Sequence, residues 1–196
     1  MKNLMPVKHT TERGKKMGEQ LKRTDRTLKY EGSILKVYTD EIQLPNGKKT
    51  HWDYIHHNGA TAIIPVRNDG KILMVRQYRN ALDRETLEIP AGKLEDKDEK
   101  PLLCAMRELE EETGYVAGKM SHLITLRTWV AFTNEKIEVY VAEELKSTAQ
   151  CLDEDEFINV EAFTMEELKE KIFSGEIQDA KTISSLLAYE VWQKKE

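Results

Sequence analysis

Apolar and polar residues alternate along several stretches of the 196-residue chain, and residues typical of turns separate these stretches. Alternation with a period of two indicates strands that bury one face. Strands are predicted over Ile34–Leu44, His51–His56, Thr61–Arg67, Lys71–Tyr78, Leu87–Ile89, Ser121–Thr128, Lys136–Ala142 and Phe157–Phe163. Pro45-Asn46-Gly47 is a predicted turn, and Asn68-Asp69-Gly70 predicts a β-hairpin between its flanking strands.

Helices are predicted from their terminal residues, because proline suits a first helical position, glycine suits a helix end, and Thr-x-x-Glu forms a capping box. The predicted helices run from Pro101 to Gly114, from the capping box of Thr164 and Glu167 to Gly175, and from Asp179 towards Trp192. Strands that alternate unevenly with a few helices favour an α+β fold, a mixed β-sheet flanked by helices.

Charge is distributed unevenly along the chain. Residues 1–29 carry nine Lys or Arg against three acidic residues, a local charge of +6, so with a total of −5 the remainder carries −11. The basic segment has no interleaved aromatic residues, which argues against nucleic-acid binding. We divide the chain into a basic N-terminal arm (1–29), an N-terminal β element that is a candidate for dimerisation (30–57) and a main domain (58–196).

The composition indicates an intracellular protein. Only two cysteines occur, Cys104 and Cys151, which is typical of a reducing compartment. The chain shows no apolar run of membrane-spanning length, and its first residues lack the apolar stretch of a signal peptide. We therefore expect a cytoplasmic location and no membrane partner.

The helix predicted after Pro101 carries the candidate chemistry. At about 100° per residue, its apolar residues share one arc that we expect to be buried: Leu102, Leu103, Ala105, Met106 and Leu109. Glu108, Glu111 and Glu112 fall on roughly the opposite side. Their mutual repulsion would be relieved by a cation, and hard oxygen ligands favour Mg²⁺ or Mn²⁺. The alternative is an ordinary solvated acidic face.

The residues around this helix resemble the Nudix box. That signature is G, five residues, E, seven residues, then R-E-U-x-E-E-x-G-U, where U is bulky and apolar. The segment from Arg107 to Tyr115 matches every fixed position, and Gly92 and Glu99 supply the first half. Six residues rather than five separate Gly92 from Glu99, which we interpret as a one-residue insertion in the loop.

The resemblance extends beyond the box. The sequence E-I-P-A-G at 88–92 is similar to the segment before the box in ADP-ribose and ADP-sugar pyrophosphatases. Residues 76–79 resemble their substrate strand, and residues 179–182 resemble their C-terminal segment. One departure concerns the S-P-G-F motif, whose proline marks ADP-ribose specificity: Val130 stands in the proline's place, while Phe132 and Glu135 are retained.

The resemblance implies an α/β/α Nudix sandwich and a role for each matching residue. Mg²⁺ would be held by the Ala91 carbonyl, Glu108 and Glu112, with Glu111 shared between ions. Arg107 would pair with a box carboxylate and hold the loop against the helix. Glu135 would be the general base, with Glu111 next in line.

Substrate-binding residues are predicted outside the helix, namely Arg76, Arg79, Glu88, Phe132 and Trp52. Guanidinium groups suit phosphate oxygens, but strand alternation sends Arg76 and Arg79 to opposite faces, and we favour Arg79. Trp52 either stacks on a nucleobase, in the manner of related dimers, or packs on the N-terminal sheet.

The expected function is Mg²⁺-dependent hydrolysis of ADP-ribose to AMP and ribose 5-phosphate by a homodimer. The first alternative is the same reaction on ADP-glucose or another nucleoside-diphosphate sugar. The second is a non-catalytic nucleotide-sugar sensor on the same fold, although such proteins usually lose the box carboxylates that this chain keeps. The third is an acidic metal-binding protein with a fortuitous motif.

Overall fold

The structure is a computed structural model that describes residues 21–32, 35–95, 98–152, 154 and 156–194. The chain divides into two compact units, Met1–Ile55 and His56–Glu196, and each is described separately below. Most of the predicted basic arm, residues 1–20, lies outside the described residues. None of the helices in the described ranges is long and apolar enough to span a membrane.

The N-terminal unit is a three-stranded sheet of β1 (Lys22–Glu31), β2 (Lys36–Gln43) and β3 (Lys49–His56), in that order. The two predicted strands and the turn between them are confirmed, with Gly47 in the left-handed region at φ 79°. β1 was not predicted as a strand, and it begins before the expected boundary at residue 30. The predicted arm therefore overlaps the β element.

Arg26 explains why a basic segment forms part of this sheet. Its guanidinium donates two hydrogen bonds of 2.6 Å to the carboxylate of Asp40 on β2. It also lies 3.7 Å from the ring centroid of Tyr54, within the range of a cation–π interaction. Arg26 thus links β1 to both of the other strands.

The second unit contains two sheets. Its mixed sheet has the order β7-β4-β9-β8, in which β4 pairs with β9 in parallel and with β7 antiparallel. These strands are β4 (Ala60–Pro65), β7 (Ala91–Lys93), β8 (Tyr115–Leu126) and β9 (Ile137–Ser147). The other sheet is antiparallel, in the order β10-β5-β6, and consists of β5 (Ile72–Arg79), β6 (Arg84–Glu88) and β10 (Ile158–Phe163).

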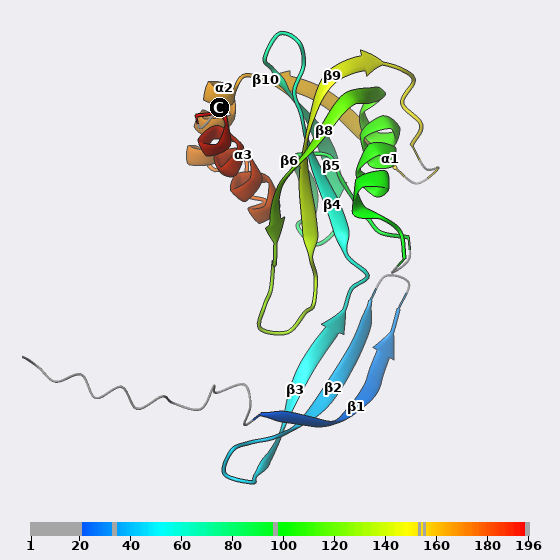
Figure 1. Cartoon of the computed structure of the whole chain (residues 1–196), viewed down its shortest axis with the longest axis vertical. Helices are drawn as coiled ribbons and strands as arrows, with labels where there is room; N and C mark the ends of the chain where they lie inside the picture. The colour runs from blue at the N-terminus through cyan, green and yellow to red at the C-terminus, as the bar shows by residue number, and fades with distance from the viewer. Residues whose placement is uncertain (1–20, 33–34, 96–97, 153, 155, 195–196) are drawn as a thin grey trace, which may run out of the picture. The chain divides into compact units, whose positions relative to one another are not determined.

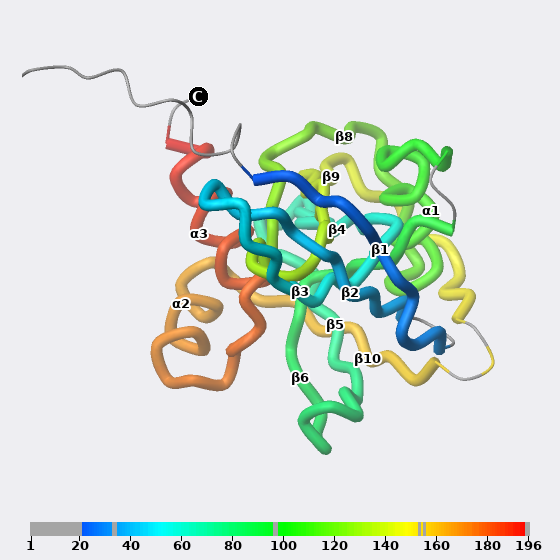
Figure 2. Tube along the Cα trace, turned by 90° about the horizontal axis from the view of Figure 1, so that it is seen from below, coloured from blue at the N-terminus to red at the C-terminus, as the bar shows by residue number. Residues whose placement is uncertain are grey.

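Three helices cover these strands: α1 (Pro101–Thr113), α2 (Met165–Phe173) and α3 (Ala180–Gln193). α1 lies on one side of the strands, and α2 and α3 lie on the other (Figure 1, Figure 2). Adjacent strand residues divide accordingly: Ile63 packs in the cluster with α1, while Ile64 packs in the cluster with α2 and α3. The predicted α+β class, with helices on both faces of a mixed sheet, is confirmed.

The predicted hairpin at residues 68–70 forms only next to its turn. A turn is present, in which the Arg67 carbonyl accepts from the N–H of Gly70, but the strands that it joins enter different sheets. The N–H of Arg67 donates to the Lys71 carbonyl at 2.8 Å, and one isolated bridge joins Val66 to Ile72. The reason is that β4 is buried almost throughout, so its edges pair with β9 and β7 in the interior. A local turn signal does not specify the partner of such a strand.

The helix ends follow the predicted signals closely. Gly114 adopts the left-handed conformation after α1, at φ 69°, and its N–H donates to the Glu110 carbonyl. Thr164 and Glu167 form both hydrogen bonds of a capping box, and the Asp179 carboxylate accepts from the N–H of Thr182. α2 ends at Phe173, two residues before the predicted Gly175.

Candidate active site

The buried face of α1 differs from the predicted one. Leu102, Leu103 and Met106 are exposed, whereas Cys104 and Glu112 are buried together with the correctly predicted Ala105 and Leu109. Cys104 contacts Thr61 of β4 and Lys93 of β7, and Ala105 and Leu109 pack in a cluster with Ile63 of β4. Glu112 therefore points towards the sheet, not towards solvent as the apolar arc indicated.

Two carboxylates of α1 converge on one short stretch of backbone. The Glu108 carboxylate occupies the space that a side chain at Gly92 would need, because a Cβ built there would lie 1.9 Å from its carboxyl carbon. The Glu112 carboxylate accepts a hydrogen bond of 3.1 Å from the N–H of Ala91. Only glycine at position 92 leaves room for this approach.

The electrostatics of this cluster favour a bound cation. Burial, followed by the charge of Glu108, raises the pKa of Glu112 to about 8. Burial also raises the pKa of Glu108, although the charge of Arg107 opposes this shift. Two carboxylates beside the Ala91–Gly92 backbone form a set of hard oxygen donors that fits Mg²⁺ or Mn²⁺. In the described residues, however, no three acidic, histidine or cysteine side chains are already arranged around a metal position.

Arg107 connects the loop to the helix. It lies 2.9 Å from Glu108, 2.8 Å from Glu111 and 3.5 Å from Glu99. Glu99 also accepts a hydrogen bond of 2.7 Å from the N–H of Glu95. The contact between Arg107 and a box carboxylate is thus present despite the extra loop residue. Glu111, predicted as a metal ligand and as a catalytic residue, is paired with Arg107.

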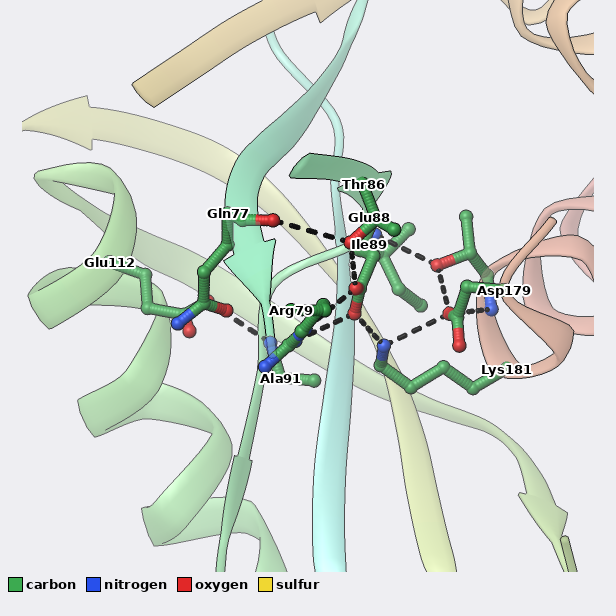
Figure 3. A network of polar contacts seen from close by, with 10 residues as sticks. Gln77, Arg79, Thr86, Glu88, Ile89, Ala91, Glu112, Asp179 and Lys181 are labelled. Atoms are coloured by element: carbon green, nitrogen blue, oxygen red, sulfur yellow. Dashed lines mark hydrogen bonds and ion pairs between the residues drawn. The ribbon is translucent and has the colours of Figure 1, made fainter. Parts of the chain in front are cut away.

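A second polar network lies beside the carboxylates and contains Glu88 and Arg79. Arg79 donates hydrogen bonds of 2.8 and 2.7 Å to the two oxygens of Glu88, and Lys181 of α3 reaches the same carboxylate from the other side (Figure 3). Burial alone would raise the pKa of Glu88, but the bond from Arg79 and the charge of Lys181 lower it to about 2. The Glu88 side chain is only 4% exposed. Glu88 therefore positions the Arg79 side chain. It binds Nε and Nη2 of Arg79 and does not bind Nη1.

Three other predicted substrate residues, Arg76, Phe132 and Trp52, are described by their own contacts and exposure. Arg76 pairs with Glu161 of β10 at 2.6 Å and with Glu176, which follows α2, at 3.3 Å. Phe132 packs against Trp129 within the loop between β8 and β9. Trp52 is half exposed on β3 of the N-terminal unit. The assignment of Arg76, Phe132 and Trp52 to substrate binding stays a prediction.

Glu135, the predicted base, has local partners. Its carboxylate accepts a hydrogen bond from the Thr128 hydroxyl and lies 3.6 Å from Nε2 of His57. Its N–H donates to the Thr133 hydroxyl at 3.1 Å. These contacts hold Glu135 at the base of the loop between β8 and β9.

Sequence reasoning missed Glu156. Its charge contributes to the raised pKa of both Glu108 and Glu112, so it lies within electrostatic range of both carboxylates. The segment before it is attached to the end of α1, since Nε2 of Gln150 donates to the Glu112 carbonyl at 2.6 Å. The acidic run at 153–156 was the available signal, but nothing in the sequence places it beside α1.

The fold and the carboxylate cluster define the class of protein. Residues 56–186 match the NUDIX domain, which is more than half of the chain, so the protein belongs to the Nudix family.

Its relatives narrow the class further. The chain is 43% identical over 155 residues to the ADP-ribose pyrophosphatase of Bacillus subtilis, covering 78% of this chain and 83% of that protein. It is also 43% identical over 165 residues to the methanol dehydrogenase activator of Bacillus methanolicus, covering 81% and 89%. Among solved structures, an ADP compounds hydrolase has the same fold, with a TM-score of 0.81 and 19% identity over 90% of this chain and 95% of that one. The protein is an enzyme, a Nudix hydrolase similar to ADP-ribose pyrophosphatases.

Proposed function

We propose that this enzyme uses Mg²⁺ to hydrolyse the diphosphate bond of a nucleoside-diphosphate sugar, and that ADP-ribose, cleaved to AMP and ribose 5-phosphate, is its substrate. The observation that carries the proposal is the convergence of Glu108 and Glu112 on the Ala91–Gly92 backbone. Mn²⁺ fits the same donors. A cytoplasmic location, expected from the low cysteine content, is part of the proposal.

The residues of the site have separate tasks in this reaction. Glu108, Glu112 and the Ala91 carbonyl would hold the metal, which when bound neutralises diphosphate oxygens and acidifies a water molecule. Arg79, held by Glu88 through Nε and Nη2, would direct its Nη1 to a phosphate oxygen. A carboxylate accepts the proton of the attacking water. We assign this step to Glu156 rather than Glu135, because the segment before Glu156 is joined to the end of α1 by the hydrogen bond from Gln150 to the Glu112 carbonyl, and the charge of Glu156 acts on Glu108 and Glu112.

The choice of ADP-ribose rests on the similarity to ADP-ribose pyrophosphatases, including one of Mycobacterium tuberculosis that is 32% identical over 161 residues. GDP-mannose pyrophosphatases are also similar, for example one of Salmonella paratyphi B that is 34% identical over 139 residues. Because Val130 stands in place of the proline that marks ADP-ribose specificity, ADP-glucose and GDP-mannose are the alternative substrates.

Purified enzyme incubated with Mg²⁺ and ADP-ribose should release AMP and ribose 5-phosphate, detected by chromatography, and a chelator should stop the reaction. We expect kcat/KM for ADP-ribose to exceed the values for ADP-glucose and GDP-mannose by about tenfold or more, as specific polar contacts allow. A higher kcat/KM for either competitor would transfer the substrate assignment to it. No hydrolysis of any of the three would refute the proposal.

We also propose that the enzyme is a two-fold homodimer formed through its N-terminal sheet. Ile42 is the only buried apolar side chain among the described residues of that unit, while Leu28, Tyr30 and Trp52 are 44 to 60% exposed. Such a small core gives a sheet little stability of its own.

Light scattering at micromolar concentration should find a dimer, and Leu28→Glu should shift it to monomer more than Lys29→Glu does. A wild-type protein that is entirely monomeric would contradict this.

A further inference from the structure

The bend between β6 and β7 carries the backbone that would bind the metal. It follows Glu88 and is held at several points: the Pro90 carbonyl accepts from the N–H of Ile63 at 2.9 Å, and the N–H of Ala91 donates to Glu112. These two contacts come from β4 and α1. Two further contacts come from the first turn of α3, on the opposite side of the strands from α1 (Figure 1, Figure 3).

Thr182 supplies the first of these contacts. The N–H of Ile89, a fully buried residue just beyond the end of β6, donates to the Thr182 hydroxyl at 3.1 Å. That hydroxyl in turn donates to the Asp179 carboxylate at 2.6 Å, which leaves an oxygen lone pair for Ile89. Thr182 is fully buried, so water cannot replace its hydroxyl without a rearrangement.

Lys181 supplies the second contact. Its ammonium group bonds to both Glu88 and Asp179, and its side chain is only 13% exposed. Glu88 lies between Lys181 and Arg79, so the position of the Arg79 guanidinium depends on a carboxylate that α3 also holds. Two successive residues of α3 thus hold Glu88, the last residue of β6, and Ile89, the first residue of the bend.

We propose that Thr182 and Lys181 are positioning residues of the active site: Thr182, oriented by Asp179, fixes the backbone that presents the Ala91 carbonyl to the metal, and Lys181 fixes Arg79 through Glu88. The inference rests on the proposed metal site at Ala91. The helix α3 contributes none of the proposed metal ligands. Its contacts with Glu88 and Ile89 nevertheless position the residues that bind metal and substrate. Partners of metal ligands commonly change metal affinity by about 10- to 100-fold when removed.

Thr182→Val tests the first contact, because valine has a similar shape and no hydroxyl. Mn²⁺ binding to the substrate-free enzyme, measured by electron paramagnetic resonance, should weaken by about tenfold or more. Amide hydrogen exchange should show faster exchange at Ile89 and Ala91. Thr182→Ser, which keeps the hydroxyl, should restore both properties.

Ser185→Ala is the matched control. Ser185 is also fully buried on α3, one turn further along, and its hydroxyl has no hydrogen-bond partner among the described residues. Mn²⁺ affinity should be unchanged in this variant. If Thr182→Val binds Mn²⁺ as wild type does, or if Ser185→Ala weakens binding equally, the positioning role of Thr182 is overturned.

Lys181→Met tests the second contact. We expect KM for ADP-ribose to rise by about tenfold with a smaller change in kcat, and Lys181→Arg to recover most of the loss. Lys169→Met, which removes a surface ion pair with Glu190, is the control for loss of one positive charge. Equal KM values for Lys181→Met and Lys169→Met would overturn this part of the inference.

The experiment separates this inference from the proposed function. Mn²⁺ binding is measured without substrate, so a wrong choice of sugar nucleotide leaves the Thr182 test intact. Wild-type enzyme that binds no Mn²⁺ would refute the metal site and the inference together. Normal Mn²⁺ binding by Thr182→Val, with weak binding by Glu112→Gln, would refute the inference alone.

Discussion

Replacing Glu112 with glutamine is expected to lower kcat by at least about 100-fold, because part of the stabilisation that the metal provides is lost. Glutamine keeps the shape of the side chain and can still accept the hydrogen bond from the N–H of Ala91. Only the negative charge is lost, and with it part of the interaction with the metal. Turnover should be measured over a range of Mg²⁺ concentrations up to saturation.

The same change should not unfold the protein. Because burial raises the pKa of Glu112 to about 8, the metal-free fold already favours the neutral form of this side chain. Thermal unfolding without metal should therefore be unchanged or shifted to higher temperature. Glu110→Gln, on the exposed side of the same helix, is the control and should turn over like wild type. Wild-type turnover by Glu112→Gln at saturating Mg²⁺ would remove Glu112 from the metal site.

Glu156→Gln is expected to lower kcat by roughly 10²- to 10⁴-fold with little change in KM, as for the loss of a general base. The reason is the position of Glu156 within electrostatic range of Glu108 and Glu112. Glu135, by contrast, is bonded to Thr128 and faces His57. Steady-state kinetics at saturating Mg²⁺ should therefore show Glu135→Gln within about threefold of wild type.

Glu154→Gln is the matched control for this experiment, since Glu154 lies in the same acidic run but is not among the main causes of the pKa shifts of Glu108 and Glu112. A kcat defect in Glu135→Gln that exceeds the one in Glu156→Gln would return the role of base to Glu135, as the family resemblance implies. A defect that disappears at high metal concentration would instead identify the residue as a metal ligand.

Local signals predicted the helix ends well because each depends on a few neighbouring residues. Gly114 stops α1 through its own backbone conformation, and Thr164 and Glu167 satisfy each other across one turn. The box motif is equally local, which is why the three carboxylates could be named from the sequence. Their identity did not require knowledge of the fold.

Contacts between distant segments could not be predicted in this way. The buried face of α1 depends on Gly92, whose missing side chain admits the Glu108 carboxylate, and an apolar arc contains no such information. The partner of β4 is β9, far along the chain, although a turn next to β4 indicated β5. Lys181 and Thr182 were recognised as part of a similar segment, but their contacts with residues 88 and 89 appear only in the folded chain.

The parallel pairing of β4 with β9 constrains how the enzyme can form during synthesis. Ala60 lies opposite Ile137, so β4 emerges from the ribosome long before its partner and has only β7 to pair with in the meantime. The hydrogen bond from the N–H of Ile89 to the Thr182 hydroxyl can form only later, because Thr182 lies in α3, which follows β9 in the sequence. A nascent chain can therefore carry every residue of the Nudix box before α3, which supplies the contacts of Thr182 and Lys181, has been translated.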